Sequence, residues 1–412
     1  MKQRIHLIIT ILLTIAISAN GQETKKDQAI SLGLKDYEGA VYEVENNYAG
    51  FSSKTSTPAR LEEYLKLKEK LHKDILNGRE GADAVGELYG WFGDYHLRTA
   101  LAEHGKYRKT RKEYVSTTKG MREYNPQAIA LKVDNETFLI RFPSCEGDPS
   151  LEWVNESIEA YKKSQCKYLI IDIRGNGGGQ DTYYMPYLKL LYDRESMSKG
   201  VEIRNSKDNI SYVKTQVERL PWLQEVVSNA ENSNEDFIPL VEDHIIKYDT
   251  IYSLPIKAAI IIDSNVASSG EQMILDIKGC SSRTMIYGKG NTLGCLDYSN
   301  IRRADMRGCG ITTYVPMTRS SRLPDNGIDE TGIAPDVRIS LPLPKILTNN
   351  IDEWVLWVAK DLKNKKNKRI GKCLEKLFIV VVAFSMIGVK PMEAEAAPGV
   401  SSEAAVVMDM DS

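Results

Sequence analysis

Two apolar runs, each ending in small turn-forming residues, most constrain what this chain can fold into. Residues 168–179 read YLIIDIRGNGGG, and residues 258–271 read AAIIIDSNVASSGE. Each begins like a buried strand and leads into a helical pattern, and strand, helix and strand in this order indicate an α/β unit. The first run supplies a glycine loop with open backbone N–H groups, and the second places a serine where a strand gives way to a helix. A hydroxyl nucleophile beside backbone N–H donors is the minimum machinery for acyl transfer.

Composition fits an ordinary globular protein. The chain has 412 residues, of which 42% are apolar and 27% charged, and this is enough for two domains or one large core with a helical appendage. The formal net charge is −2, and no basic face suggests nucleic acid as a partner.

The N-terminus has the pattern of a secretory signal peptide. Lys2 and Arg4 precede an apolar stretch over residues 7–17, which small residues follow. The apolar run is too short for a membrane-spanning helix. We therefore expect residues 1–21 to be removed and the protein to be exported, to the periplasm or beyond the cell.

Upstream of the β-rich core we expect two segments. Residues 22–57 are polar and are predicted to form an irregular N-terminal arm. Residues 58–125 are predicted to form a small helical subdomain, with one helix from Pro58 and another around 83–92. The apolar face expected on the first helix comprises Leu61, Leu65, Leu71 and Ile75.

Residues 126–362 are predicted to form the core domain. It should start with a hairpin of two strands, 128–133 and 137–142, continue with a helix over 150–163, and end with a helix over 351–362. The long, charged segment 205–250 is interpreted as an insertion or lid.

The C-terminal tail, residues 363–412, is basic and then apolar, like a second signal peptide or short anchor appended to a complete domain. Two interpretations stay open. One is a segment that associates with a membrane surface, and the other is a gene-fusion artefact without a role. We expect no catalytic residue there.

Six cysteines are present, and none forms a C-x-x-C motif or a His/Cys cluster in the sequence. Zinc is therefore not expected, and neither a metal nor an organic cofactor is predicted. Cys295 and Cys309 flank what reads as a hairpin, and we expect them to lie near each other, where a disulfide could form after export.

Four motifs, in order, resemble the tail-specific (C-terminal-processing) serine peptidases and their tricorn-type relatives. They are Asp94-Tyr95-His96, Asp172-x-Arg174-Gly175-Asn176-Gly177-Gly178-Gly179, Ala267-Ser268-Ser269-Gly270-Glu271 and Gly332-Ile333-Ala334-Pro335-Asp336. The resemblance covers roughly residues 60–345. It implies an α/β fold with a mixed-sheet, crotonase-like or ClpP-like peptidase core, a small N-terminal helical subdomain and polypeptide substrates. Too few residues separate the first two motifs to hold a PDZ domain as well as the predicted hairpin and helix.

The resemblance assigns the nucleophile to Ser268, three residues before Glu271. A strand-to-helix turn exposes the side chain, although serine is also common as a plain helix N-cap, and Ser269 is its neighbouring competitor. The backbone N–H groups of Gly177 or Gly178, paired with that of Ser269, suit an oxyanion hole. A nucleotide-binding loop would need other spacing after the glycines.

The general base is assigned by comparing two branches of the family. Many members use a lysine after a Thr-x-Gly motif, but here Cys295 stands at that position after Thr292-Leu293-Gly294. The tricorn-type branch uses a histidine, and His96 matches its Asp-x-His pattern. Imidazole titrates near neutral pH and suits proton transfer.

A carboxylate before Gly332 should orient the imidazole, and both Asp329 and Glu330 are candidates. We expect an exported serine endopeptidase that forms an acyl-enzyme on Ser268. Two other hypotheses stay open: a peptide-binding pseudoenzyme, suggested by the absent lysine, and a Ser–Lys enzyme that uses Lys289.

Substitution tests the choice of nucleophile. Ser268→Ala should abolish peptidase activity and labelling by a fluorophosphonate, because the attacking oxygen is removed, while the circular dichroism spectrum stays unchanged. Ser269→Ala serves as the matched control and should have a much milder effect. Equal activities of Ser268→Ala and wild type would refute the assignment.

Overall fold

The computed structural model describes residues 25–99, 126–308, 310–344 and 351–364. The predicted signal peptide, the basic segment around 106–120 and most of the C-terminal tail lie outside these ranges. Within the described ranges, no helix has the length and apolar character needed to cross a membrane.

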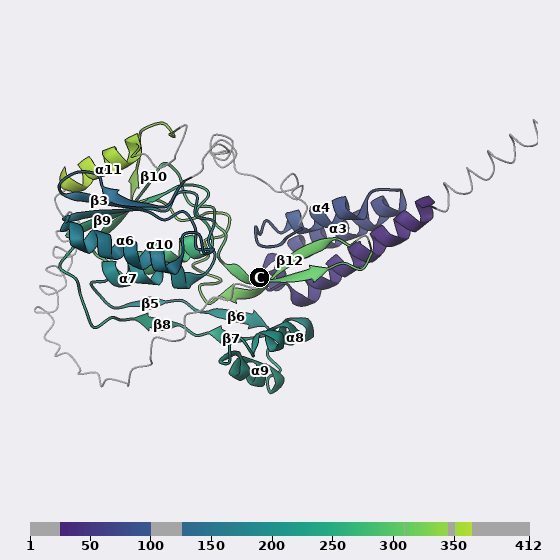
Figure 1. The fold of residues 1–412 in the computed structure, drawn as a ribbon. Coiled ribbons are helices and arrows are strands. Elements are labelled where there is room, and N and C mark those ends of the chain that lie inside the picture. Colours follow the sequence, from purple (N-terminus) through teal and green to yellow (C-terminus); the bar gives the residue numbers. More distant parts are fainter. Residues whose placement is uncertain (1–24, 100–125, 309, 345–350, 365–412) are drawn as a thin grey trace, which may run out of the picture.

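A six-stranded mixed sheet forms the centre of the fold (Figure 1). Its strand order is β13-β10-β9-β4-β3-β2, and every neighbouring pair is parallel except the antiparallel hairpin β2–β3. The predicted hairpin and α/β fold are confirmed. The strands are β2 (Ile129–Lys132), β3 (Thr137–Arg141), β4 (Tyr168–Asp172), β9 (Lys257–Ile262), β10 (Thr284–Gly288) and β13 (Val337–Arg338).

Helices cover both faces of this sheet, so its central strands are apolar on both sides. Along β4, Leu169 and Ile171 face one core and Ile170 faces the other, as the two-residue period of a strand requires. Helix α11 (Glu353–Asn364) packs on the Ile170 face (Figure 1). The other face is covered by α6 (Leu151–Ser164), α7 (Met185–Leu191) and α10 (Ser269–Cys280).

A second, antiparallel sheet extends from the core. Strand β12 (Thr312–Ser320) pairs with β1 (Arg98–Thr99), with β11 (Tyr298–Asp305) and with β6 (Val201–Arg204), which in turn pairs with β7 (Phe237–Val241). A two-stranded ribbon of β5 (Ser196–Ser198) and β8 (His244–Ile246) lies between β6–β7 and the core helices (Figure 1).

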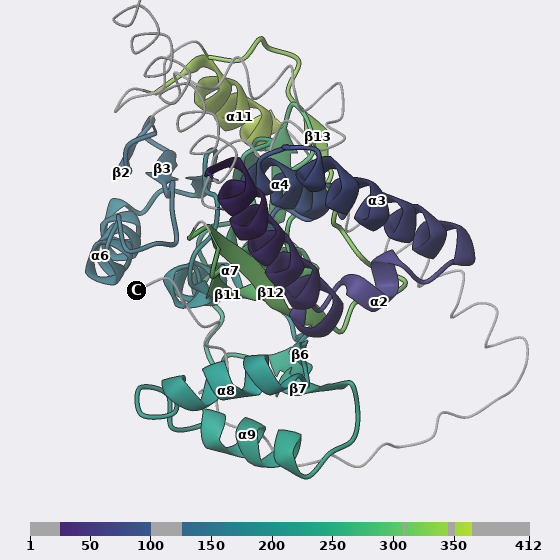
Figure 2. The same ribbon diagram turned by 90° about the vertical axis from the view of Figure 1, so that its right-hand side faces the viewer.

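The segment 205–250 is a folded part of this second sheet rather than a separate lid. Helices α8 (Lys207–Gln216) and α9 (Leu223–Glu231) pack on β6 and β7 around an apolar cluster of their own. Figure 2 shows this helix pair on the side of the sheet away from α3 and α4. The predicted helix near 220–230 is confirmed as α9.

Residues 25–57 are helical, so the expectation of an irregular arm is wrong. A helix over residues 25–42 continues into the wide turn η1 (Glu43–Asn47), followed by the short helix α2 (Phe51–Lys54). Figure 2 shows the first helix lying across β11 and β12. The buried face has a helical period that continues into η1 but carries polar side chains: Asp36 of the helix accepts from Gly308 N–H, and Glu43 of η1 pairs with Arg302. A search for apolar periodicity alone misses such a face.

Helix α3 (Pro58–Leu76) and helix α4 (Gly81–Trp91) confirm the predicted helical subdomain. The predicted apolar face of α3 is only half correct. Leu71 and Ile75 are buried together with Tyr64, whereas Leu61 and Leu65 remain 41% and 48% exposed. The buried stripe therefore runs through Tyr64, because an aromatic ring reaches the cluster around Phe92 and Trp91.

The expected proximity of Cys295 and Cys309 stays a prediction. Cys295 is a buried free thiol. The segment after it contains the eight-residue strand β11, which pairs with β12 rather than within residues 296–308. Cys309 itself lies outside the described residues.

The topology places two predicted motifs side by side. Strands β4 and β9 are parallel neighbours, with Asp172 opposite Ile261, so their carboxyl ends meet at the same edge of the sheet. The glycine loop follows β4, and the turn at Ser268 follows β9. Ligand and catalytic sites of open α/β sheets form at this edge.

A buried network of charges ties this edge to the last helix. Arg174 donates to Asp172 Oδ2 at 2.6 Å and to Asp352 Oδ2 at 2.7 Å, and Arg141 donates to Asp172 at 2.9 Å. Asp352 also accepts the N–H groups of Trp354 and Val355, so it caps the first turn of α11. Two buried guanidinium groups thus share two carboxylates, and removing either carboxylate would leave positive charge buried without compensation.

Asp352→Ala should lower the free energy of unfolding by about 3 kcal/mol or more, because the buried Arg174 loses its second carboxylate and α11 loses its cap. Urea unfolding followed by circular dichroism measures this change. The exposed Asp325→Ala serves as the control and should change stability by less than about 0.5 kcal/mol. Indistinguishable midpoints for the two variants would contradict a stabilising role for the network.

Candidate active site

Ser268 occupies a strained turn between β9 and α10. Its backbone has φ 51° and ψ −124°, a combination that L-residues rarely adopt. Such strain costs on the order of 1–3 kcal/mol and persists where the surrounding structure enforces it, typically at functional sites. A sharp strand-to-helix turn of this kind lifts a serine side chain above the sheet edge.

The two neighbouring serines have different environments. Ser268 is half-buried, makes no side-chain cap to α10, and its hydroxyl has no hydrogen bond to any described residue. Ser269 is buried, and its hydroxyl donates to the Gly179 carbonyl at 2.7 Å. Of the two serines, Ser268 therefore has the hydroxyl that is available for reaction. Ser268 is not a plain helix cap, because its side chain makes no capping hydrogen bond.

Asn176 joins the glycine loop to this turn. Its carbonyl accepts the N–H of Ala267 at 3.0 Å, and its side-chain oxygen accepts the N–H of Gly178 at 3.0 Å. Gly178 has φ +104°, and a Cβ added to it would lie only 2.6 Å from Ser268 Cβ. The loop can therefore approach Ser268 this closely only with glycine at 178.

The three backbone N–H groups predicted as oxyanion donors differ in whether they already have an acceptor. The N–H of Gly178 is already used by Asn176. The N–H groups of Gly177 and Ser269 donate to no acceptor among the described residues, and space beside Gly177 is open. Ser269 begins α10, so its N–H also lies at the positive end of the helix dipole. Gly177 and Ser269 thus suit an oxyanion better than Gly178 does.

Glu271 holds the loop 292–295 beside the turn at Ser268 through hydrogen bonds. Its carboxylate accepts hydrogen bonds from Thr292 Oγ1 at 2.5 Å and from the N–H groups of Gly294 and Cys295, each at 2.8 Å. The Cys295 carbonyl in turn accepts the N–H of Ser268 at 3.0 Å. Burial raises the pKa of Glu271 to about 7, against the opposing effect of these donors.

His96 is held by the backbone that follows this loop. Its Nδ1 lies 2.6 Å from the carbonyl oxygen of Tyr298, and because a carbonyl only accepts, Nδ1 carries the proton. Asp94 Oδ1 accepts the backbone N–H of His96 at 2.8 Å, and Tyr48 donates to Asp94 Oδ2 at 2.9 Å. In the neutral imidazole the lone pair is then on Nε2, the state that a general base requires.

Cys295 lies close to both Ser268 and His96. The Cys295 backbone contacts Ser268, and its thiol lies within 4.8 Å of ligand atoms of both His96 and Asp94. No hydrogen bond joins Ser268 Oγ to His96 within the described part of the chain. Catalytic hydrogen bonds are often long before a substrate binds, so the pairing of Ser268 with His96 stays a prediction.

The two predicted carboxylates differ sharply in environment. Asp329 Oδ1 accepts the N–H groups of Leu296 and Asp297, each at 2.8 Å, while its Oδ2 is buried without a hydrogen bond to a described residue. Burial, with the charges of Asp94 and Asp297, raises the pKa of Asp329 well above its usual value. Glu330 is exposed and pairs with Lys54 at 3.0 Å.

Several site residues were missed by sequence reasoning. Tyr48 and Lys54 come from the segment expected to be irregular, and Tyr298 contributes a backbone carbonyl, which leaves no signal in a sequence. Lys54 packs over the Tyr298 ring; burial opposes its charge, but Glu330 and Asp94 more than compensate and raise its pKa. Lys289 donates to the Leu341 carbonyl at 3.0 Å, which does not support a Ser–Lys dyad.

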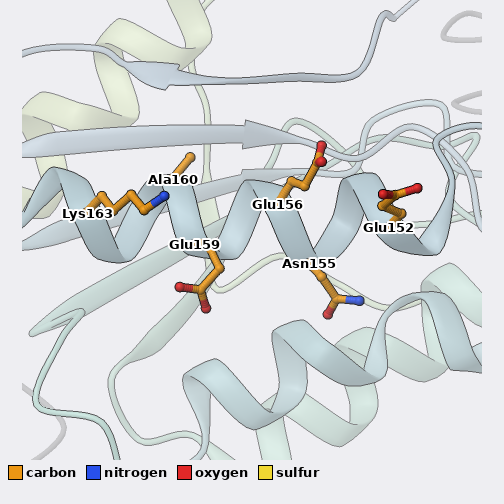
Figure 3. A pocket seen from close by; sticks show the side chains of 6 residues that line it. All are labelled: Glu152, Asn155, Glu156, Glu159, Ala160 and Lys163. Carbon is orange, nitrogen blue, oxygen red and sulfur yellow. The ribbon is translucent and has the colours of Figure 1, made fainter.

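A hollow of about 580 Å³ lies along α6, away from these residues (Figure 3). Side chains of this one helix line it: Glu152, Asn155, Glu156, Glu159, Ala160 and Lys163. A substrate site usually gathers polar groups from several elements, so this surface hollow is not a candidate for catalysis.

Comparison with known proteins identifies a peptidase family. The family model described as peptidase family S41 matches residues 137–339. No curated protein matches the chain. Mature CPAF in complex with lactacystin is 10% identical, with 75% of this chain and 94% of that chain covered and a TM-score of 0.55.

Two further solved structures are similar over comparable lengths. Mature CPAF alone is 11% identical, with 75% of this chain and 93% of that chain covered and a TM-score of 0.54. A putative peptidase from Parabacteroides merdae is 13% identical, with 75% and 90% covered and a TM-score of 0.49. At these identities the CPAF structures support the fold alone.

The contact between the glycine loop and the serine generates a prediction. Gly178→Ala should reduce turnover at least about 100-fold, because the new Cβ must displace the Ser268 side chain, and misplaced catalytic groups cost about this much. Gly290→Ala is the matched control, since a Cβ there meets nothing within 4 Å. Full activity of Gly178→Ala, measured with a fluorogenic peptide, would contradict the proposed proximity.

Proposed function

This chain belongs to peptidase family S41 and is a serine-type peptidase, and from that premise we propose that it cleaves polypeptides through an acyl-enzyme on Ser268. In this proposal His96 is the general base, and the N–H groups of Ser269 and Gly177 bind the oxyanion. The observation that carries it is the strained Ser268 turn, with φ 51° and ψ −124°, which leaves this hydroxyl available while that of Ser269 is engaged.

The first half of the reaction forms the acyl-enzyme. His96 Nε2 takes the hydroxyl proton as Ser268 Oγ attacks the carbonyl carbon of the peptide, and the carbonyl π electrons move onto oxygen. The two N–H groups stabilise that negative charge. His96 then gives the proton to the amide nitrogen, the C–N bond breaks, and the amine product leaves.

The second half releases the carboxylic acid. A water molecule gives a proton to His96 Nε2 and attacks the ester carbonyl, and the oxyanion again lies against the same N–H donors. Its collapse breaks the bond to Ser268 Oγ, which recovers a proton from His96. The enzyme returns to its starting protonation state.

We assign Asp329, rather than the exposed Glu330, as the positioning carboxylate. Asp329 holds the N–H groups of Leu296 and Asp297, immediately before Tyr298, whose carbonyl fixes the proton on His96 Nδ1. The carboxylate therefore acts through the backbone of this loop. Asp94 fixes the segment that carries His96 in a similar way.

We also propose that the protein is exported, on the basis of the signal-peptide pattern in residues 1–21. The basic and apolar tail supports a further proposal, that residues 363–389 contact a membrane surface. Comparing the N-terminus and the cell fraction of the mature protein by mass spectrometry tests export. An intact N-terminus in the cytoplasmic fraction would contradict it.

The role of His96 predicts a pH profile. Peptidase activity should fall below about pH 6.5, where an ordinary imidazole becomes protonated and loses the lone pair that accepts the Ser268 proton. His96→Ala should cost nearly as much activity as removing Ser268, because the residues act as a unit. Lys289→Ala is the control and should retain activity, since its ammonium group faces Leu341.

Fluorophosphonate labelling separates a working enzyme from a pseudoenzyme, because only an activated serine forms the adduct. We expect labelling of the wild type and of Lys289→Ala, and strongly slowed labelling of His96→Ala. An activity that depends on Lys289 but not on His96 would replace this mechanism with a Ser–Lys dyad.

A further inference from the structure

We propose that Asp94, His96 and Cys295 form a binding site for Zn²⁺ and similar transition-metal ions, and that occupancy of this site inhibits the peptidase. The inhibitory part rests on the proposed role of His96 as general base. The metal is an inhibitor in this proposal, and the peptidase reaction described above does not use it.

The three side chains already converge. A carboxylate oxygen of Asp94, a ring nitrogen of His96 and Cys295 Sγ all lie within 4.8 Å of one another. Around Zn²⁺, with bonds of about 2.0–2.3 Å, tetrahedral ligand atoms lie roughly 3.3–3.8 Å apart. Small rotations of these side chains would therefore bring all three atoms to bonding distance.

His96 and Asp94 already have hydrogen-bond partners of the kind that orient metal ligands. His96 donates Nδ1–H to the Tyr298 carbonyl at 2.6 Å, which fixes the orientation of the ring. Asp94 accepts from the Tyr48 hydroxyl at 2.9 Å and from a backbone N–H at 2.8 Å. Such partners orient metal ligands and are characteristic of metal centres.

The surroundings also restrict where the donors can move. Asp94 is 1% exposed and Cys295 4% exposed, while His96 is half-buried and remains accessible to solvent. Cys295 is further held by Glu271 through its N–H and by Ser268 through its carbonyl. The backbone of Cys295 is consequently held in place, while its side chain can still rotate toward the imidazole.

The donor set selects the kind of ion. One thiolate, one imidazole and one carboxylate suit Zn²⁺ or Co²⁺ and do not suit Mg²⁺ or Ca²⁺, which require oxygen ligands. Binding would release the thiol proton to solvent and leave a fourth position for water. It would also occupy the His96 lone pair, so that no base remains for the Ser268 hydroxyl.

A search for zinc-binding spacing could not find this site. Cys295 follows His96 by about 200 residues, and no second cysteine lies within the two to four residues typical of a zinc-binding pair. The three ligands come together because the loop 292–295, held by Glu271, meets the segment that follows α4. Among the described residues, these three form the group of His, Cys and acidic side chains with metal-binding proximity.

Cobalt spectroscopy tests the site without requiring turnover. Untagged, metal-free, full-length protein is titrated with Co²⁺, and the expected result is tetrahedral d–d absorption together with a thiolate-to-cobalt charge-transfer band. Zn²⁺ should abolish both signals. Cys295→Ser should lose the charge-transfer band and bind Zn²⁺ at least about tenfold more weakly. Cys166→Ser, which changes another buried cysteine, is the matched control and should keep both.

The inhibitory role is tested on the same samples. Zn²⁺ should block fluorophosphonate labelling of wild type and Cys166→Ser, and a chelator should restore it. His96→Ala, at a half-buried position, is a second ligand variant and should also weaken Zn²⁺ binding, with circular dichroism confirming that it is folded.

The experiments distinguish an absent metal site from an absent peptidase activity. Wild type that reacts with the fluorophosphonate but shows no charge-transfer band would refute the metal site and leave the peptidase proposal intact. A protein that gives the cobalt spectrum but never reacts would support the metal site and contradict the peptidase proposal. Equal Zn²⁺ affinities of wild type and Cys295→Ser would also refute the site.

Discussion

The carboxylate of Glu271 is the interaction on which the rest of the site depends. It lies in the first turn of α10, three residues after Ser268, and it binds a hydroxyl and two N–H groups of the loop 292–295. Because the same loop accepts the N–H of Ser268, the strained turn and the loop form one unit. The surrounding hydrogen bonds offset the strain that Ser268 carries.

This unit connects the two parts of the molecule. After Cys295 the chain enters β11 and the second sheet, against which the N-terminal helices pack. Those helices bring Tyr48 and Asp94 to the loop, and Asp94 orients His96. The proposed nucleophile thus comes from the six-stranded sheet and the proposed base from the helical part. Catalysis would require both parts to be folded and in contact.

The features that the sequence predicted best are the strands and turns, which depend on the local pattern of residues. The apolar runs 168–173 and 256–263 became neighbouring parallel strands, and the small residues after each became the loop and turn at one sheet edge. Ser268 could be named only through the family resemblance, because the composition of the turn alone also fits a plain helix N-cap. The distinct environment of Ser269 depends on a contact with Gly179 and could not be read from the sequence.

The features that the sequence could not predict are mostly hydrogen bonds of backbone groups and polar contacts between residues far apart in the chain. The Tyr298 carbonyl at His96 and the N–H of Gly178, already used by Asn176, leave no trace in residue identity. The helix over residues 25–42 was missed because its buried face carries Asp36, whose partner is a backbone N–H about 270 residues away. The meeting of Cys295 with His96 likewise depends on tertiary structure.

The central claim is that Ser268, and not the nearby thiol of Cys295, is the nucleophile. Trapping the acyl-enzyme tests it most directly: the protein is mixed with an activated peptide ester, quenched in acid during the kinetic burst, digested and analysed by mass spectrometry. The account predicts an acyl group on Ser268, as an ester that withstands neutral hydroxylamine. A thioester on Cys295, or a burst without acylation of Ser268, would contradict it.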